Sequence, residues 1–130
     1  MKKLFLVCLM LLSGSAWAEW VLIGETDNGG EVVSFWVDPS TIKKNGSRRK
    51  VWGITAFTSR NEFGALSNRW QEEYDCKEEQ ARYLALSAHS ERFAGGHTIL
   101  VNTINPKDEV FAPVAPGTLR SGAMEFVCSK

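Results

Sequence analysis

Apolar and alternating segments separated by turn residues dominate this chain, and the alternation has the two-residue period of β-strands. The segments with these patterns cover residues 20–25, 31–38, 50–59, 68–76 and 97–104. Clusters of Gly, Asn, Asp and Pro separate several of them, as expected for turns. Both faces of segment 31–38 are largely apolar, which predicts a strand that is covered on both sides. The pattern therefore predicts a domain built mainly from strands.

The segment that begins at Asn68 separates its side chains most cleanly. The face expected to meet the core carries Trp70, Glu72, Tyr74 and Cys76. Glu72 is expected near the edge of that face. Glu73 and Asp75 alternate with the core residues and are expected to be solvated. This argues against a general-acid role for the acidic cluster at 72–79.

The second half of the chain is expected to contain one more strand and a helix. Residues 77–82 have helical propensity, but alternation across 81–88 favours a strand after a short turn. Residues 105–116 hold three of the four prolines and are predicted to be a loop. Thr118 can cap a helix that runs to Cys128. Its apolar stripe consists of Leu119, Gly122, Ala123, Phe126 and Val127.

Residues 1–18 have the pattern of an export signal. Two lysines precede an apolar run at 4–12, and residues 16–18 (Ala-Trp-Ala) form an A-x-A cleavage site. The run is shorter than the roughly 20 residues that a helix needs to span a bilayer. Cys8 lies inside it and lacks the context of a lipoprotein cleavage site. We therefore expect cleavage of this signal peptide, no lipid anchor, no transmembrane segment, and one mature domain over 19–130.

Only Cys76 and Cys128 remain after this cleavage. An exported chain meets an oxidising compartment, where an even number of cysteines usually means a disulfide. A Cys76–Cys128 bond would close a loop of 52 residues (128 − 76). Closing such a loop stabilises the fold by about 4 kcal/mol in the loop-entropy model. A catalytic or redox role is the alternative, and the absence of a C-x-x-C motif argues against it.

The charges are balanced overall but unevenly distributed. The 15 basic and 15 acidic residues give no global signature of a protein that binds nucleic acid or anionic membranes. Between segments 31–38 and 50–59 lies Asn45-Gly46, a tight-turn signal that predicts a hairpin. Five basic residues flank this turn, and they are Lys43, Lys44, Arg48, Arg49 and Lys50. We expect a cationic tip that either binds an acidic partner or simply remains solvated and blocks edge pairing.

Reaction chemistry is sparse in this sequence. It contains no G-x-S-x-G elbow, no glycine-rich phosphate loop and no H-E-x-x-H motif. His89 and His97 could face each other across adjacent strands, but we interpret them as surface or hairpin-end residues. We predict no enzymatic activity, no cofactor and no metal. Four tryptophans are expected mainly in the core, with a binding face as the alternative, and they are Trp20, Trp36, Trp52 and Trp70.

A series of short motifs is distributed along the chain. They are Phe35-Trp36-Val37-Asp38-Pro39-Ser40-Thr41-Ile42, Val51-Trp52, Ser67, Glu73-Tyr74-Asp75-Cys76, Arg82-Tyr83, Phe93-Ala94-Gly95-Gly96, Ala115-Pro116-Gly117-Thr118 and Val127-Cys128. Their order, together with both cysteines, resembles the surface-adhesin protein E family over nearly the whole mature chain. The resemblance implies an α+β, mainly β fold: an antiparallel sheet of about six strands and a C-terminal helix fastened by one disulfide. It also favours a strand from Ala81 onwards.

The resemblance also implies a function. The family's namesake is a surface lipoprotein that adheres to host cells and matrix proteins. The A-x-A site departs from that pattern, so we favour a periplasmic or secreted protein of the bacterial envelope over a surface-anchored one. The first hypothesis is a non-enzymatic binding protein whose basic hairpin contacts a host matrix protein, a sulfated glycan or another acidic partner. The second is a periplasmic structural or small-ligand-binding protein, with its pocket on the sheet under the helix.

Overall fold

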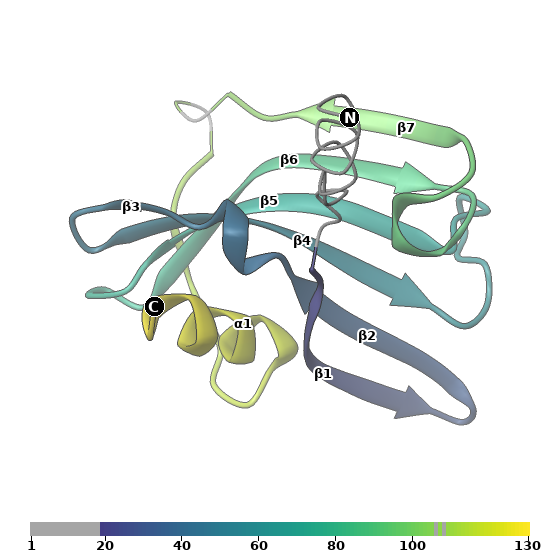
Figure 1. Ribbon diagram of the computed structural model, residues 1–130, viewed down its shortest axis with the longest axis horizontal. Coiled ribbons are helices and arrows are strands. Elements are labelled where there is room, and N and C mark those ends of the chain that lie inside the picture. The colour runs from purple at the N-terminus through teal and green to yellow at the C-terminus, as the bar shows by residue number, and fades with distance from the viewer. Residues whose placement is uncertain (1–18, 106, 108) are drawn as a thin grey trace, which may run out of the picture.

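The computed structural model describes residues 19–105, 107 and 109–130; the predicted signal segment at 1–18 lies outside them (Figure 1). Over the described residues, eight strands form one antiparallel sheet in which six principal strands follow the order β1-β2-β4-β5-β6-β7. These are β1 (Val21–Asn28), β2 (Glu31–Val37), β4 (Arg48–Phe57), β5 (Ser67–Asp75), β6 (Gln80–His89) and β7 (Thr98–Thr103). The short strands β3 (Lys43–Asn45) and β8 (Ala112–Pro113) pair with β4 and β6. The predicted antiparallel sheet is confirmed.

Two local predictions about strands need adjustment. The turn expected over residues 27–30 is only Gly29-Gly30, with φ values of 68° and 94°, because β1 continues to pair with β2 as far as Asn28. The predicted loop at 105–116 contains β8, which is too short to show a period. The strand preferred for the ambiguous segment is confirmed as β6, and Glu79 ends the preceding turn at a φ of 53°.

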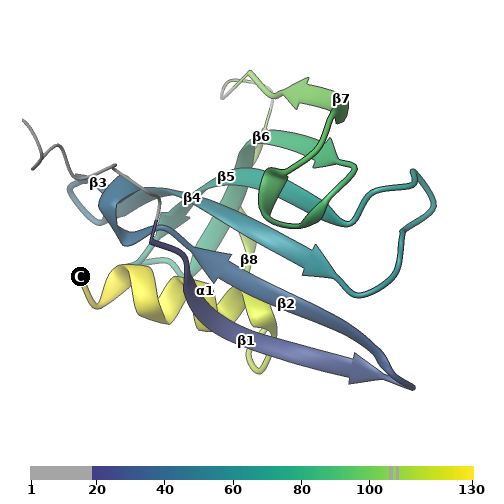
Figure 2. The ribbon, with the colours of Figure 1, turned by 45° about the vertical axis from the view of Figure 1, so that its right-hand side comes forward.

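Helix α1 (Leu119–Cys128) covers one face of the sheet and contacts β1, β2 and β4 (Figure 2). It starts as predicted at Thr118, whose hydroxyl accepts from the backbone N–H of Ser121 at 3.1 Å. The Ser121 hydroxyl in turn accepts from the Thr118 N–H, which completes a capping box. Buried side chains from the sheet and the helix form the core, and they include Val37, Val51, Trp70, Tyr74, Ala123 and Val127.

Gly53 makes room for the largest of these side chains. It lies opposite Trp70 in the β4–β5 register, and a Cβ on Gly53 would stand 2.2 Å from the indole ring. The ring therefore occupies the space that a side chain at 53 would fill. The indole N–H donates to the Thr55 hydroxyl at 3.0 Å, so the ring is buried with its polar atom satisfied.

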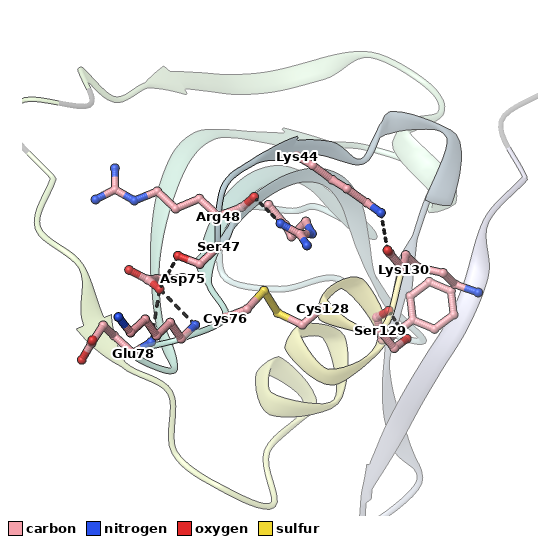
Figure 3. Close-up of a disulfide and its surroundings, with 12 residues drawn as sticks. Lys44, Ser47, Arg48, Asp75, Cys76, Glu78, Cys128, Ser129 and Lys130 are labelled. Atoms are coloured by element: carbon pink, nitrogen blue, oxygen red, sulfur yellow. Dashed lines mark hydrogen bonds between the residues drawn. A yellow bond between two sulfur atoms is a disulfide. The ribbon is translucent and has the colours of Figure 1, made fainter.

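The predicted bond between Cys76 and Cys128 is confirmed, with 5.8 Å between the two Cα atoms (Figure 3). Cys76 follows β5, whereas Cys128 is the last residue of α1. The bond therefore fastens the end of the helix to the turn between β5 and β6.

Glu72 was predicted to lie near the edge of the core face. It is instead fully buried, at 0% exposure. Its carboxylate accepts from Nε of Arg120 at 3.1 and 3.2 Å. Burial raises the pKa of Glu72, and the charge of Arg120 opposes that rise. The guanidinium also lies 4.7 Å from the centre of the Tyr83 ring. The prediction was wrong because the compensating cation comes from α1, 48 positions along the chain.

Glu73 was expected to be solvated, and this prediction is also wrong, because only 4% of the residue is exposed. It lies opposite Arg82 in the β5–β6 register and accepts from Nε and Nη2 of Arg82 at 2.9 and 2.6 Å. The Phe111 ring covers this pair, 4.5 Å from the Arg82 guanidinium. Strand alternation assigned the correct face to Glu73, but the sequence did not show that Phe111 covers that face.

Candidate functional site

The β3–β4 hairpin carries the cationic tip and extends beyond the sheet near the C-terminus (Figure 1). The predicted hairpin is present, but its turn is Gly46-Ser47, one position later than predicted, because Asn45 still pairs with Arg48. Gly46 has a φ of 59°. The first strand of the hairpin, however, is the short β3 and not segment 31–38. That segment forms β2, which pairs with the later part of β4, from Gly53 to Phe57.

Strand alternation divides the five predicted basic residues between two faces. Lys43, Arg48 and Lys50 lie on the face directed away from α1, and Lys44 and Arg49 lie on the helix side. Lys43, Lys44 and Arg48 are exposed, whereas the other two are half-buried. The hairpin therefore presents most of its charge on one face.

Like charges stand directly opposite each other in this hairpin. Lys43 pairs with Lys50, and Lys44 pairs with Arg49, in the β3–β4 register. Like-charged cross-strand neighbours are destabilising, because their side chains are only about 5 Å apart at Cβ. These like-charged pairs therefore do not stabilise the folded hairpin.

The helix side of the tip already has partners. Lys44 donates to the main-chain oxygen of Lys130, whereas Arg48 points away to the other side (Figure 3). Nη1 of Arg49 donates to the carbonyls of Gly46 and Arg48, at 2.7 and 2.9 Å. These two cations stabilise the local structure and are less available to a ligand than those on the opposite face.

On the opposite face, no carboxylate of the described residues forms an ion pair with a hairpin cation; Glu73 lies opposite Lys50 in the register but pairs with Arg82. The Arg48 guanidinium stacks 4.8 Å from the centre of the Phe111 ring. Asp75 is opposite Arg48 in the register, but its carboxylate accepts from Ser47 and from two backbone N–H groups. Within the described part of the chain, none of the five hairpin cations forms an ion pair with Asp or Glu.

The disulfide supports the tip from the helix side. The carbonyl of Ser47, in the turn, accepts from the backbone N–H of Cys76 at 2.9 Å. Cys76 is bonded in turn to Cys128 at the end of α1. The displayed charges therefore stand on a turn that is fixed to two other elements, which lowers the entropy that binding would cost.

The two histidines lie in different surroundings. His89 is the last residue of β6 and so has the hairpin-end position that was expected, but it is buried at 8% exposure, while His97 is exposed. His89 contacts the hydroxyls of Ser87 and Thr98. Within residues 19–105, 107 and 109–130, no three His, Cys, Asp or Glu side chains group as metal ligands do.

The sheet beneath α1 is filled by core side chains, including Val37, Val51 and Val127. A groove of about 280 Å³ lies elsewhere on the same face, and no residue of α1 lines it. Its lining consists of Thr55, Asn68, Trp70, Tyr83, Leu86 and Ile104. The hypothesised sheet face thus carries a groove, which lies beside α1 and not beneath it.

Comparisons with known proteins agree with this fold. The family model described as Surface-adhesin protein E matches residues 20–129. One crystal form of Haemophilus influenzae protein E aligns with a TM-score of 0.55 at 12% identity, over 73% of this chain and 80% of that chain. Its selenomethionine form gives 0.56 at 13% identity, over 73% and 78%. No curated protein sequence matches the chain. None of the described helices has the length and apolar character needed to cross a membrane.

Proposed function

Because the chain belongs to the surface-adhesin protein E family, we propose that it is an exported, non-enzymatic binding protein whose β3–β4 hairpin contacts an acidic partner. The partner is a sulfated glycan or an acidic segment of a host matrix protein. The observation that carries this proposal is the pairing of Lys43 with Lys50 and of Lys44 with Arg49. These contacts cost stability, and an anionic partner would relieve the repulsion.

Heparin is a suitable probe because it is a sulfated polyanion. We expect salt-sensitive retention of the protein on a heparin column. Lys43→Gln combined with Lys50→Gln should elute at clearly lower salt, because an exposed and a half-buried cation are lost from the face directed away from α1. The melting temperature should stay the same or rise slightly, since a repulsive pair has been removed.

The matched control removes two cations that lie away from the hairpin, Arg60 after β4 and Arg92 in the 3-10 turn Arg92–Ala94. Arg60→Gln with Arg92→Gln changes the net charge equally, and both positions are exposed. Its elution should stay close to that of the parent. Equal loss in both double variants would indicate attraction by net charge alone and would contradict a hairpin site.

The compartment is a separate part of the proposal. We propose cleavage after Ala18 and release of an unlipidated domain into the periplasm or the medium. Cell fractionation with N-terminal sequencing tests this. An acylated N-terminus would contradict it, and a purely periplasmic pool would favour the second hypothesis, a structural or small-ligand-binding role.

A further inference from the structure

A groove of about 300 Å³ lies on the sheet face directed away from α1. β4, β5, β6 and β7 all contribute to it, and its lining includes Trp52, Arg69, Ala85, Ser87, Thr98 and Val101. The β-sheet register brings these residues together, because Arg69 lies opposite Ser87 and Ser87 lies opposite Val101. The groove is therefore built on strands and does not depend on a loop for its shape.

Arg69 is held over the groove by an aromatic ring. Its guanidinium stacks 4.3 Å from the centre of the Trp52 ring. In the part of the chain that the structure describes, the Arg69 guanidinium has no hydrogen bond and no ion pair. A guanidinium presents five N–H donors in a planar fork that matches a carboxylate. Arg69 is thus an oriented cation whose donors are available to a ligand.

A hydroxyl group beside His89 supplies a second hydrogen-bond donor to the groove. Its Nε2 lies 2.7 Å from the Ser87 hydroxyl, and its Nδ1 lies 3.4 Å from the Thr98 hydroxyl. Burial, and then the charge of Arg69, lowers the pKa of His89, which favours the neutral ring. A neutral imidazole has one donor and one acceptor. One hydroxyl therefore donates to the ring, and the other accepts from it and keeps its own proton for a ligand, whichever tautomer is present.

We propose that this groove binds a small organic carboxylate, with the carboxylate on Arg69 and the body of the molecule between Ala85 and Val101. The donors suit an acceptor, and among the described residues no Asp or Glu lines the groove to repel an anion. Val101 is 69% exposed, so an apolar body would cover it. The volume lies at the lower end for small-molecule sites. This site is distinct from the hairpin and does not depend on the hairpin proposal.

Two sources share this chemistry, an acidic sugar and an apolar acid. Sodium glucuronate represents the first and sodium cyclohexanecarboxylate the second. Each is titrated into ¹⁵N-labelled protein at constant ionic strength, with glucose and cyclohexanol as neutral controls. We expect saturable shifts of the Trp52 indole N–H signal, assigned with Trp52→Phe, for at least one carboxylate and for neither neutral compound. Binding of one acid alone identifies the source, whereas binding of neither overturns the proposal.

Three variants test the assigned geometry. Arg69→Gln should weaken binding at least tenfold, and Ala85→Leu should do the same by filling the groove while leaving the charge. Arg92→Gln should bind as the parent does, because Arg92 is also stacked on a ring, 5.7 Å from that of Phe93, but lies outside the groove. If the Ala85→Leu variant folds and binds the acid as tightly as the parent, the acid contacts Arg69 without entering the groove. The proposed binding site is then wrong. An unchanged fold is checked from the remaining amide signals.

Discussion

Glu72 and Arg120 illustrate how much one residue depends on a distant partner. Glu72 is fully buried, and only 27% of the Arg120 side chain is exposed. A buried charge left without its partner costs several kcal/mol, more than an exposed pair ever contributes. The ion pair also ties α1 to the centre of the sheet, so its effect extends beyond these two side chains.

We expect Arg120→Met to reduce the free energy of unfolding by about 3 kcal/mol at pH 7, since Glu72 would lose its cation. Burial raises the pKa of Glu72, and removing Arg120 should raise it further. The folded state then keeps a proton that the unfolded state loses above the ordinary pKa of 4.5. Stability of the variant therefore falls as the pH rises through that window. Denaturant unfolding at pH 4 and pH 7 should show the larger loss at pH 7.

Arg60→Met is the control for this prediction. Arg60 pairs with Glu91 at 3.5 Å, but the two side chains are 51% and 57% exposed. An exposed pair contributes about 0–1 kcal/mol. Arg60 also donates to the carbonyls of Gly64 and Ser90, so any loss should be small and the same at both pH values. Equal losses at both pH values in Arg120→Met would contradict the assigned role of the Glu72 charge.

At the scale of elements, the disulfide is the clearest connection between helix and sheet. It links Cys76, directly after β5, to Cys128, the last residue of α1. Replacing both cysteines by serine removes the constraint without leaving an unpaired thiol. We expect a loss of about 4 kcal/mol, because the closed loop spans 52 positions. The melting temperature should fall by about 10 °C or more.

Far-UV circular dichroism with thermal melting measures this effect, and the parent protein under reducing conditions is the matched comparison. Both samples should melt at similar temperatures, well below the oxidised parent. A double variant that melts with the oxidised parent would show that core packing alone holds α1.

The main elements could be predicted because each carries a local signal. Alternation indicated the strands, and Thr118 indicated the start of α1. The β3–β4 hairpin was recognised from Asn45-Gly46, but β3 was not, because three charged or polar residues show no alternation. β8 has two residues and is stabilised by pairing with β6, so it leaves no pattern of its own.

At the scale of the whole molecule, the two proposed sites differ in how visible they are in the sequence. The hairpin cations all lie within residues 43–50, so local composition alone pointed to them. The groove residues Trp52, Arg69 and Ser87 come from three strands and meet only through the register. A binding role was predicted for Trp52 only as the alternative to a place in the core, and no binding role was predicted for Arg69. A sequence read strand by strand cannot show which side chains stand side by side.

Both proposed sites face away from α1, and Lys50 of the hairpin is two residues before Trp52 on β4. That spacing is about 7 Å along a strand, so the tip and the groove are close enough for one acidic polymer to contact both. The stacked position of Arg69 beside Trp52, walled by Ala85 and Val101, favours a separate ligand in the groove. We therefore expect saturating glucuronate or cyclohexanecarboxylate to leave heparin elution unchanged at matched ionic strength. Arg69→Gln should likewise elute near the Arg92→Gln control. If the acid that binds the groove displaces heparin, and its neutral counterpart does not, the hairpin and the groove form one continuous site.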